Sequence, residues 1–261
     1  MRRERAPLWI GLLAALGAAF FIIPLIGLVV STPWGDAARS LTSADTLEAL
    51  KLSLIASLSS TALALVLGVP LAWVYARVDF PGRSVIRALT TLPMVLPPVV
   101  GGVALLLAFG RRGLLGSWLA LAGVSLPFTT AGVVLAETFV AMPFLVLTVE
   151  AGLRSMDRRY EDAARTLGAR RWTVFTRVTL PLIAPSIFAG AVLCWARALG
   201  EFGATITFAG NFPGVTQTMP LAVYQLLNET NPEGSFVLSL ILLVVSLVVL
   251  VGLRHRWLGS V

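Results

Sequence analysis

Long runs of apolar residues constrain this chain more than any other feature of its sequence. A helix needs about 20 mostly apolar residues to cross a hydrocarbon core of roughly 30 Å. Besides the six spans given below, the chain has a shorter apolar run at residues 114–126. At about 1.5 Å per residue this run is too short to cross the hydrocarbon core, so we expect it to be an interfacial or re-entrant piece on the outer side. The sequence predicts an all-α integral membrane protein with six transmembrane helices. These cover residues 8–30, 50–75, 85–109, 128–149, 182–208 and 236–253.

The composition supports lipid rather than water as the main solvent. Hydrophobic residues make up 57% of the chain and charged residues 13%, whereas a soluble domain carries about 25% charged residues. The single cysteine, Cys194, excludes an intramolecular disulfide, and the single histidine makes a structural zinc site very unfavourable, so no metal site is expected. The net charge of +7 lies in short loops between apolar runs, which argues against nucleic acid as a partner.

The basic residues between the apolar segments predict the orientation in the membrane. Loops rich in arginine stay in the cytoplasm, and six spans place fifteen arginines on one side against four basic residues on the other. We therefore expect a multi-pass protein of the bacterial cytoplasmic (inner) membrane with both termini in the cytoplasm. The first apolar segment is longer than the 7–15 residues of a signal-peptide core, so we expect it to be retained.

The cytoplasmic loop between spans four and five, residues 151–179, holds the most informative pattern. Residues 160–167 favour a short helix with acidic residues in its first turn. Gly168 follows and suits a left-handed helix end. Leu180 and Pro181 come next, and a proline is well tolerated in the first turn of a span. Without further context the helix would be read as a surface helix in a long loop.

The spacing in this loop resembles the EAA loop of ABC importer permeases. Glu161 and Ala163 are followed by Gly168, nine residues, Val178, one residue and Leu180-Pro181. Asp162 and Val178 depart mildly from the family pattern without changing the spacing. The resemblance implies a type I ABC importer permease fold, with residues 1–261 as one permease domain and a coupling helix that docks on a separate ATPase. The residues that it assigns to coupling are Tyr160, Glu161, Asp162, Ala163, Ala164, Leu167, Gly168, Leu180 and Pro181, and Glu161 is expected to pair with basic groups of the ATPase.

The chain has no sequence of its own for ATP chemistry. A phosphate-binding loop needs a lysine in a glycine-rich context, and the only lysine, Lys51, stands between two leucines. The resemblance therefore implies a transport subunit that is not an enzyme and binds no cofactor, with ATP and Mg²⁺ bound by the partner ATPase. The partners that it implies are a second copy of the chain, two cytoplasmic ABC ATPase subunits, an external oxyanion-binding protein and the lipid bilayer.

Charged side chains inside the predicted spans mark a candidate translocation path. Ionisable groups in mid-membrane are costly and usually face a pore or a charged partner. Arg197 and Glu201 are four residues apart, so they share a helix face and can pair. A structural ion-pair network is an equally good reading. The prolines of span three predict a kink that lines the path. The candidate path residues are Arg197, Glu201, Thr205, Glu137, Pro97 and Pro98.

Two stretches resemble the molybdate/tungstate branch of the oxyanion permeases. Residues 200–204 read Gly-Glu-Phe-Gly-Ala, and residues 216–221 read Thr-Gln-Thr-Met-Pro-Leu. Sulfate permeases share the first stretch, so the second favours molybdate, or tungstate, as the oxyanion carried into the cytoplasm. A sulfate or thiosulfate ABC permease is the alternative. A proton-coupled secondary transporter is a weaker alternative, because it shows internal repeats that are not seen here and leaves the coupling loop without a role. A non-transporting scaffold is weaker still, because it would not need helices broken by prolines.

Overall fold

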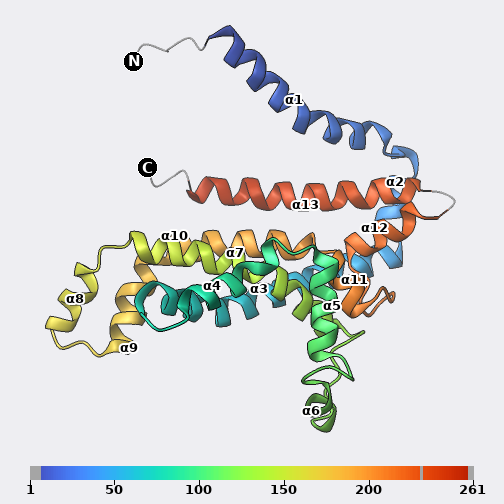
Figure 1. Ribbon diagram of the computed structural model, residues 1–261. Helices are drawn as coiled ribbons and strands as arrows, with labels where there is room; N and C mark the ends of the chain where they lie inside the picture. Colours follow the sequence, from blue (N-terminus) through green and yellow to red (C-terminus); the bar gives the residue numbers. More distant parts are fainter. Residues whose placement is uncertain (1–6, 230–231, 258–261) are drawn as a thin grey trace. The chain divides into compact units, whose positions relative to one another are not determined.

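The computed structural model describes residues 7–229 and 232–257, and in this part of the chain every regular element is helical (Figure 1). The helices form two compact units. One contains residues 48–221, and the other contains the segments before and after them. The predicted all-helical class is therefore confirmed.

The terminal segments form the first unit. It contains α1 (Leu8–Ser31) and α2 (Trp34–Leu41), together with α13 (Glu233–Trp257), which contacts both of them. α1 is apolar on all sides and has no buried residue. A helix of this kind is stable only when lipid or another protein surrounds it. α3 (Ala44–Arg77) and α12 (Met219–Leu227) each begin in one unit and end in the other.

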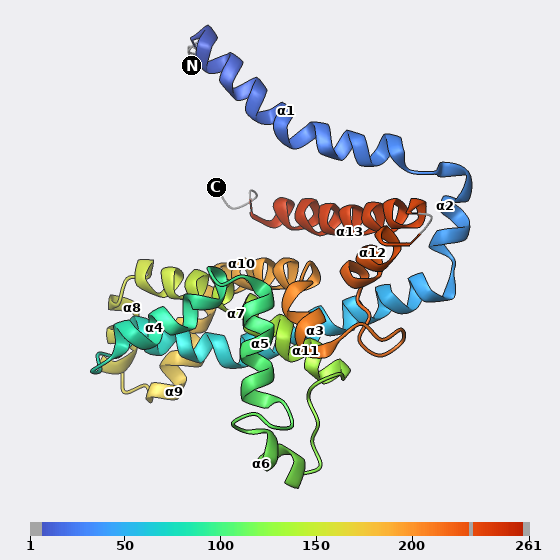
Figure 2. The same cartoon turned by 45° about the vertical axis from the view of Figure 1, so that its right-hand side comes forward.

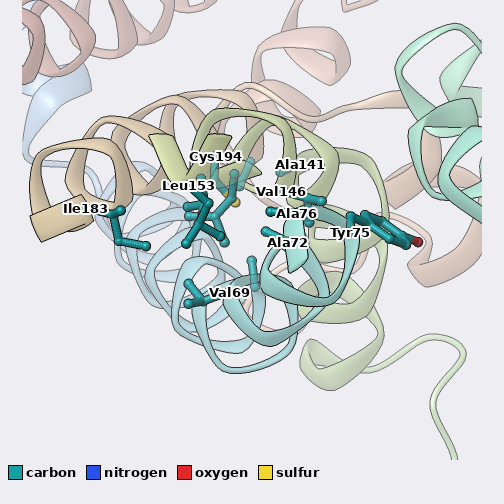
Figure 3. Packing of buried hydrophobic residues seen from close by; sticks show 13 residues of the cluster. Val69, Ala72, Tyr75, Ala76, Ala141, Val146, Leu153, Ile183 and Cys194 are labelled. Atoms are coloured by element: carbon teal, nitrogen blue, oxygen red, sulfur yellow. The ribbon is translucent and has the colours of Figure 1, made fainter. Parts of the chain in front are cut away.

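Three long helices build the core of the second unit, namely α3, α7 (Thr130–Ser155) and α10 (Leu180–Leu199). Figure 3 shows their buried side chains meeting around Leu153 and Cys194. Two glycines, Gly68 in α3 and Gly190 in α10, permit the close approach of these helices to α7. A Cβ atom on Gly68 would lie 2.9 Å from Leu145 Cδ2, and one on Gly190 would lie 3.2 Å from the Leu145 backbone. Small residues at such crossings are typical of helix packing in membranes.

The predicted third span is sharply bent. α4 (Arg83–Thr91) and the 3₁₀ turn η1 (Leu92–Met94) precede α5 (Pro98–Phe109), at an angle of 119° to it (Figure 2). Pro97 and Pro98 lack backbone N–H groups and disfavour helix in the residues before them. The predicted kink is therefore present, and it is large enough to split the segment into two helices.

The fifth span also differs from a single helix over residues 182–208. A continuous helical run already begins at Arg171, through α9 (Arg171–Val174) and the π-helical turn η2 (Phe175–Thr179), and ends at Leu199. α11 (Gly203–Ala209) follows after a break. The helix therefore begins before the predicted span and is interrupted inside it, at residues 200–202.

Four described helices are long and apolar enough to cross a membrane, and the bent pair makes five if it counts as one span. These four are α1, α3, α7 and the run Arg171–Leu199. The described side chains of α13 end at residue 249, so part of the predicted sixth span lies outside them. The short run 114–126 contains only α6 (Gly116–Leu121), as expected for a segment that does not span.

Candidate functional site

The short helix predicted for residues 160–167 is present as α8 (Arg159–Thr166). It begins where the backbone N–H of Arg159 donates to Asp157 Oδ1 at 2.9 Å. Its last residue is Thr166, and Gly168 follows the C-cap with a φ of +83°, the left-handed conformation expected from the sequence. No atom lies within 4 Å of the position that a Cβ on Gly168 would occupy, so the backbone angle is what favours glycine here.

Glu161 points into the protein rather than toward a partner. It is 3% exposed. Its Oε2 lies 3.2 Å from Arg77 Nε in α3, and its Oε1 accepts a hydrogen bond of 2.7 Å from the Thr179 hydroxyl. The carboxylate therefore holds the loop to the membrane helices. This differs from the expectation that it pairs with basic groups of an ATPase, because the sequence alone does not reveal that Arg77 lies beside it.

The opposite side of α8 is open. Tyr160, Ala163 and Leu167 are exposed, Leu167 by 88%, and their spacing places them on one helix face. Asp162 is also exposed and pairs with Arg165 at 3.2 Å, while Ala164 is half-buried. The structure thus separates the predicted coupling residues into an inward anchor and an outward apolar face.

Leu180 and Pro181 lie within the continuous helical run and do not begin it. The Leu180 N–H donates to the carbonyl of Phe175, five residues earlier, across the π-helical turn η2. The turn shifts the hydrogen-bond ladder directly before Pro181, which has no N–H to contribute. The proline is therefore accommodated by η2 rather than by a helix start.

A second buried carboxylate, Glu150, was not identified from the sequence. Its Oε1 lies 2.7 Å from Arg154 Nη2, and its Oε2 lies 3.0 Å from Arg87 Nε. The contact with Arg87 joins α4 to the end of α7. The sequence held one signal for this site, since Glu150 and Arg154 are four residues apart at the end of an apolar segment.

The predicted pairing of Arg197 with Glu201 is present. Arg197 Nη2 lies 2.6 Å from Glu201 Oε2, and the two side chains are 28% and 1% exposed. Glu201 lies in the break between α10 and α11, and its Oε1 accepts a hydrogen bond of 2.8 Å from the backbone N–H of Ala204. It therefore also caps the start of α11, where a carboxylate is favourable.

Glu137 and Thr205 add buried polar atoms near this pair. Both residues are buried, and in the described part of the chain Glu137 Oε2 and Thr205 Oγ1 have no hydrogen-bond partner. Glu137 and Glu201 lie close enough to interact electrostatically. α7, which carries Glu137, packs against both α10 and α11.

The predicted prolines meet this cluster at the start of α5. A Cβ on Gly203 would lie 2.8 Å from Pro98 Cβ, so the starts of α5 and α11 touch. Pro97 is exposed and caps α5. The structure therefore brings Pro98 next to the break that contains Glu201.

Comparisons with known proteins agree with this architecture. The molybdenum transport system permease protein ModB of Mycobacterium tuberculosis is 48% identical over 252 residues, which cover 96% of this chain and 94% of that protein. The sulfate transport system permease protein CysT of Escherichia coli is 34% identical over 236 residues, covering 89% of this chain and 85% of that protein.

A solved structure shares the fold. A bacterial alginate ABC transporter in complex with an alginate pentasaccharide-bound periplasmic protein matches with a TM-score of 0.76 at 20% identity, covering 95% of this chain and 92% of that chain. Residues 64–259 match the sequence family described as binding-protein-dependent transport system inner membrane component. This chain, which has the fold of an ABC importer permease, belongs to that family.

Proposed function

We propose that this chain is the permease subunit through which an ABC importer carries molybdate, or tungstate, into the cytoplasm. The observation that carries the proposal is the likeness to a molybdenum permease over nearly the whole chain, which is greater than the likeness to a sulfate permease. As a family member the chain is a transport subunit of the inner membrane, and ATP hydrolysis belongs to a separate subunit.

The proposed topology has six spans within one permease domain, residues 1–261. They are α1, α3, the bent pair α4 and α5, α7, the α10–α11 segment, and α13. Both termini then lie in the cytoplasm, in agreement with the distribution of arginines. In this topology the loop 151–179 faces the cytoplasm, where an ATPase can reach it.

In the proposed coupling mechanism α8 docks on the ATPase through its outward face. Tyr160, Ala163 and Leu167 supply apolar contact area, and the small side chain of Ala163 permits close approach. Glu161 acts as the anchor. Because its partners are Arg77 of α3 and Thr179 of η2, movement of α8 pulls directly on two membrane helices.

The proposed path runs past the break between α10 and α11. Arg197 supplies positive charge for an oxyanion, while Glu201, Glu137 and Thr205 line the same region. Pro98, with Pro97 before it, positions the start of α5 against this break. Exchange of the Arg197–Glu201 pair for an Arg197–oxyanion contact would open the path without leaving the arginine uncompensated.

The proposed assembly contains two copies of the chain and two ATPase subunits, which bind ATP and Mg²⁺. An external binding protein delivers the oxyanion, as a periplasmic protein binds the alginate transporter of similar fold. A pair of identical permeases fits the general preference of oligomers for two-fold symmetry.

Reconstitution of the chain with its ATPase and binding protein in vesicles tests this function. We expect ATP-dependent uptake of molybdate that an excess of tungstate inhibits and an excess of sulfate does not. Uptake of sulfate or thiosulfate in preference to molybdate would establish the alternative substrate. Uptake that follows a proton gradient and ignores ATP would refute the ABC importer mechanism.

A further inference from the structure

A cavity of about 890 Å³ lies between the end of α3 and the loop that carries α8 and α9. Neither the docking face of α8 nor the Arg197–Glu201 pair lines it. Its side chains divide into an apolar part, supplied mainly by α3 and α9, and a charged part, supplied mainly by the loop. The cavity is therefore amphipathic.

The charged part of the cavity is positive. Four arginines line it against two carboxylates. Two of the arginines are already paired with these carboxylates, at 3.2 Å in both cases. The other two, Arg158 and Arg171, supply the excess positive charge. The full charged set is Arg77, Arg158, Arg165, Arg171, Glu161 and Asp162.

Arg77 offers an unused hydrogen-bond donor inside the cavity. Its side chain is 7% exposed, and Nε faces Glu161. Nη2 is buried and has no hydrogen-bond partner in the described part of the chain. A buried donor without an acceptor is costly. An anionic oxygen in the cavity would satisfy it, and guanidinium groups bind phosphate oxygens well.

The apolar part continues along α3. Trp73 packs edge-on against Phe175, with ring centroids 6.1 Å apart. Along the same helix, apolar residues recur at intervals of four, at Val66, Pro70, Val74 and Val78. Of these, Val66 and Pro70 are exposed. This spacing forms one helix face, so an apolar track leads from the span toward the arginines. Tryptophan beside such a track is typical of the membrane–water interface.

We propose that this cavity binds an anionic phospholipid, with its phosphate on Arg77, Arg158 and Arg171 and an acyl chain along the Val66–Pro70 face. Basic pockets between membrane helices on the cytoplasmic side bind such head groups. An acidic peptide would satisfy the arginines but would leave the apolar track of a membrane helix uncovered. The proposal rests on the membrane placement of the family and not on molybdate as the substrate. Since Arg77 is also bound to the Glu161 anchor, the lipid would stabilise the coupling loop.

Two double variants with equal charge change test the proposal. Arg158→Gln/Arg171→Gln removes the excess charge that lines the cavity. Arg159→Gln/Arg170→Gln removes the neighbouring arginines, which do not line it. Each protein, purified with its ATPase, is titrated with phosphatidylglycerol and with phosphatidylcholine, and bound lipid is counted by native mass spectrometry. We expect the cavity variant to bind phosphatidylglycerol about tenfold more weakly or worse. The control variant should match the wild type, and phosphatidylcholine should bind none of them specifically.

Three results would overturn the proposal. Equal weakening in both double variants would mean diffuse attraction to the surface. Displacement of the lipid by millimolar inorganic phosphate would mean a site for free phosphate. Loss of ATPase binding in the cavity variant without lipid present would make the cavity a protein docking site. Arg171→Gln alone, at an exposed position, keeps the test valid if the double variant does not fold, since it should still weaken binding of phosphatidylglycerol.

Discussion

Arg77 at the end of α3 and Glu161 in α8 form an ion pair of 3.2 Å in which both side chains are almost fully buried. The pair connects the loop 151–179 to a helix that lies far earlier in the sequence. A buried pair of this kind is costly to break from one side, because the remaining charge has no counterion.

We therefore expect Glu161→Ala and Arg77→Ala each to destabilise the protein by about 3–5 kcal/mol. Since removal of both charges leaves neither uncompensated, the double variant should lose clearly less than the sum. Thermal unfolding in detergent measures the stability of the two single variants and of the double variant. Additive losses would show that the two side chains do not depend on each other.

Gly168→Val should weaken coupling by disturbing the end of α8. The φ of +83° costs a residue with a side chain about 1–2 kcal/mol, and a β-branched residue fits it worst. Gly168→Asn is the matched control, because asparagine tolerates this conformation. The readout is binding of the purified chain to its ATPase. If the valine variant bound the ATPase as well as the wild type does, the left-handed conformation of residue 168 would not be needed for coupling.

The Arg197–Glu201 pair should behave as a unit. Arg197→Ala and Glu201→Ala should each lower the yield of folded protein, and the double variant should recover part of it. Glu201→Ala should be the more harmful, because it also removes the acceptor for the Ala204 N–H. Yield and thermal stability check this prediction.

Transport separates the two roles of the same pair. If Arg197 serves the oxyanion, the double variant should fold but should not take up molybdate. Glu137→Gln is a useful companion, since it removes a buried ionisable group of α7 without changing the shape of the side chain. Full uptake by the double variant would leave the pair with a structural role alone.

Gly102→Ala should separate α5 from α11. The added methyl would lie 2.6 Å from Thr207 Cβ and 2.9 Å from the Ala204 carbonyl oxygen. Overpacking of this kind costs about 1–3 kcal/mol. Gly17→Ala in α1 is the control, because its added Cβ would meet no atom within 4 Å. Thermal unfolding should distinguish the two, and equal stability would mean that the α5–α11 contact yields easily.

The sequence was most informative where structure is determined locally. The apolar segments that became α1, α3 and α7 were predicted because a hydrocarbon solvent selects them by length. Gly168 was predicted because a left-handed residue has few alternatives. The Arg197–Glu201 pair was predicted from helical spacing, which still brings the two together across the end of α10.

Features that depend on distant partners could not be predicted. Glu161 turns inward because Arg77 of α3 lies beside it, and nothing near Glu161 in the sequence indicates this. The ion pair between Glu150 and Arg87 was not predicted for the same reason. The break after α10 was missed because Glu201 was read only as a charge, whereas it also caps the next helix.

The helical run Arg171–Leu199 has a mechanical consequence. Its 29 residues form one piece about 43 Å long, from the loop 151–179 to the break beside Glu201. If this helical run keeps its length, an axial displacement at Arg171 is transmitted to Leu199. The run contains the π-helical turn and, further along, Pro185, and its Gly190 packs closely against Leu145 of α7. An axial displacement of the loop would thus shift Leu199 against the capped start of α11, beside the Arg197–Glu201 ion pair.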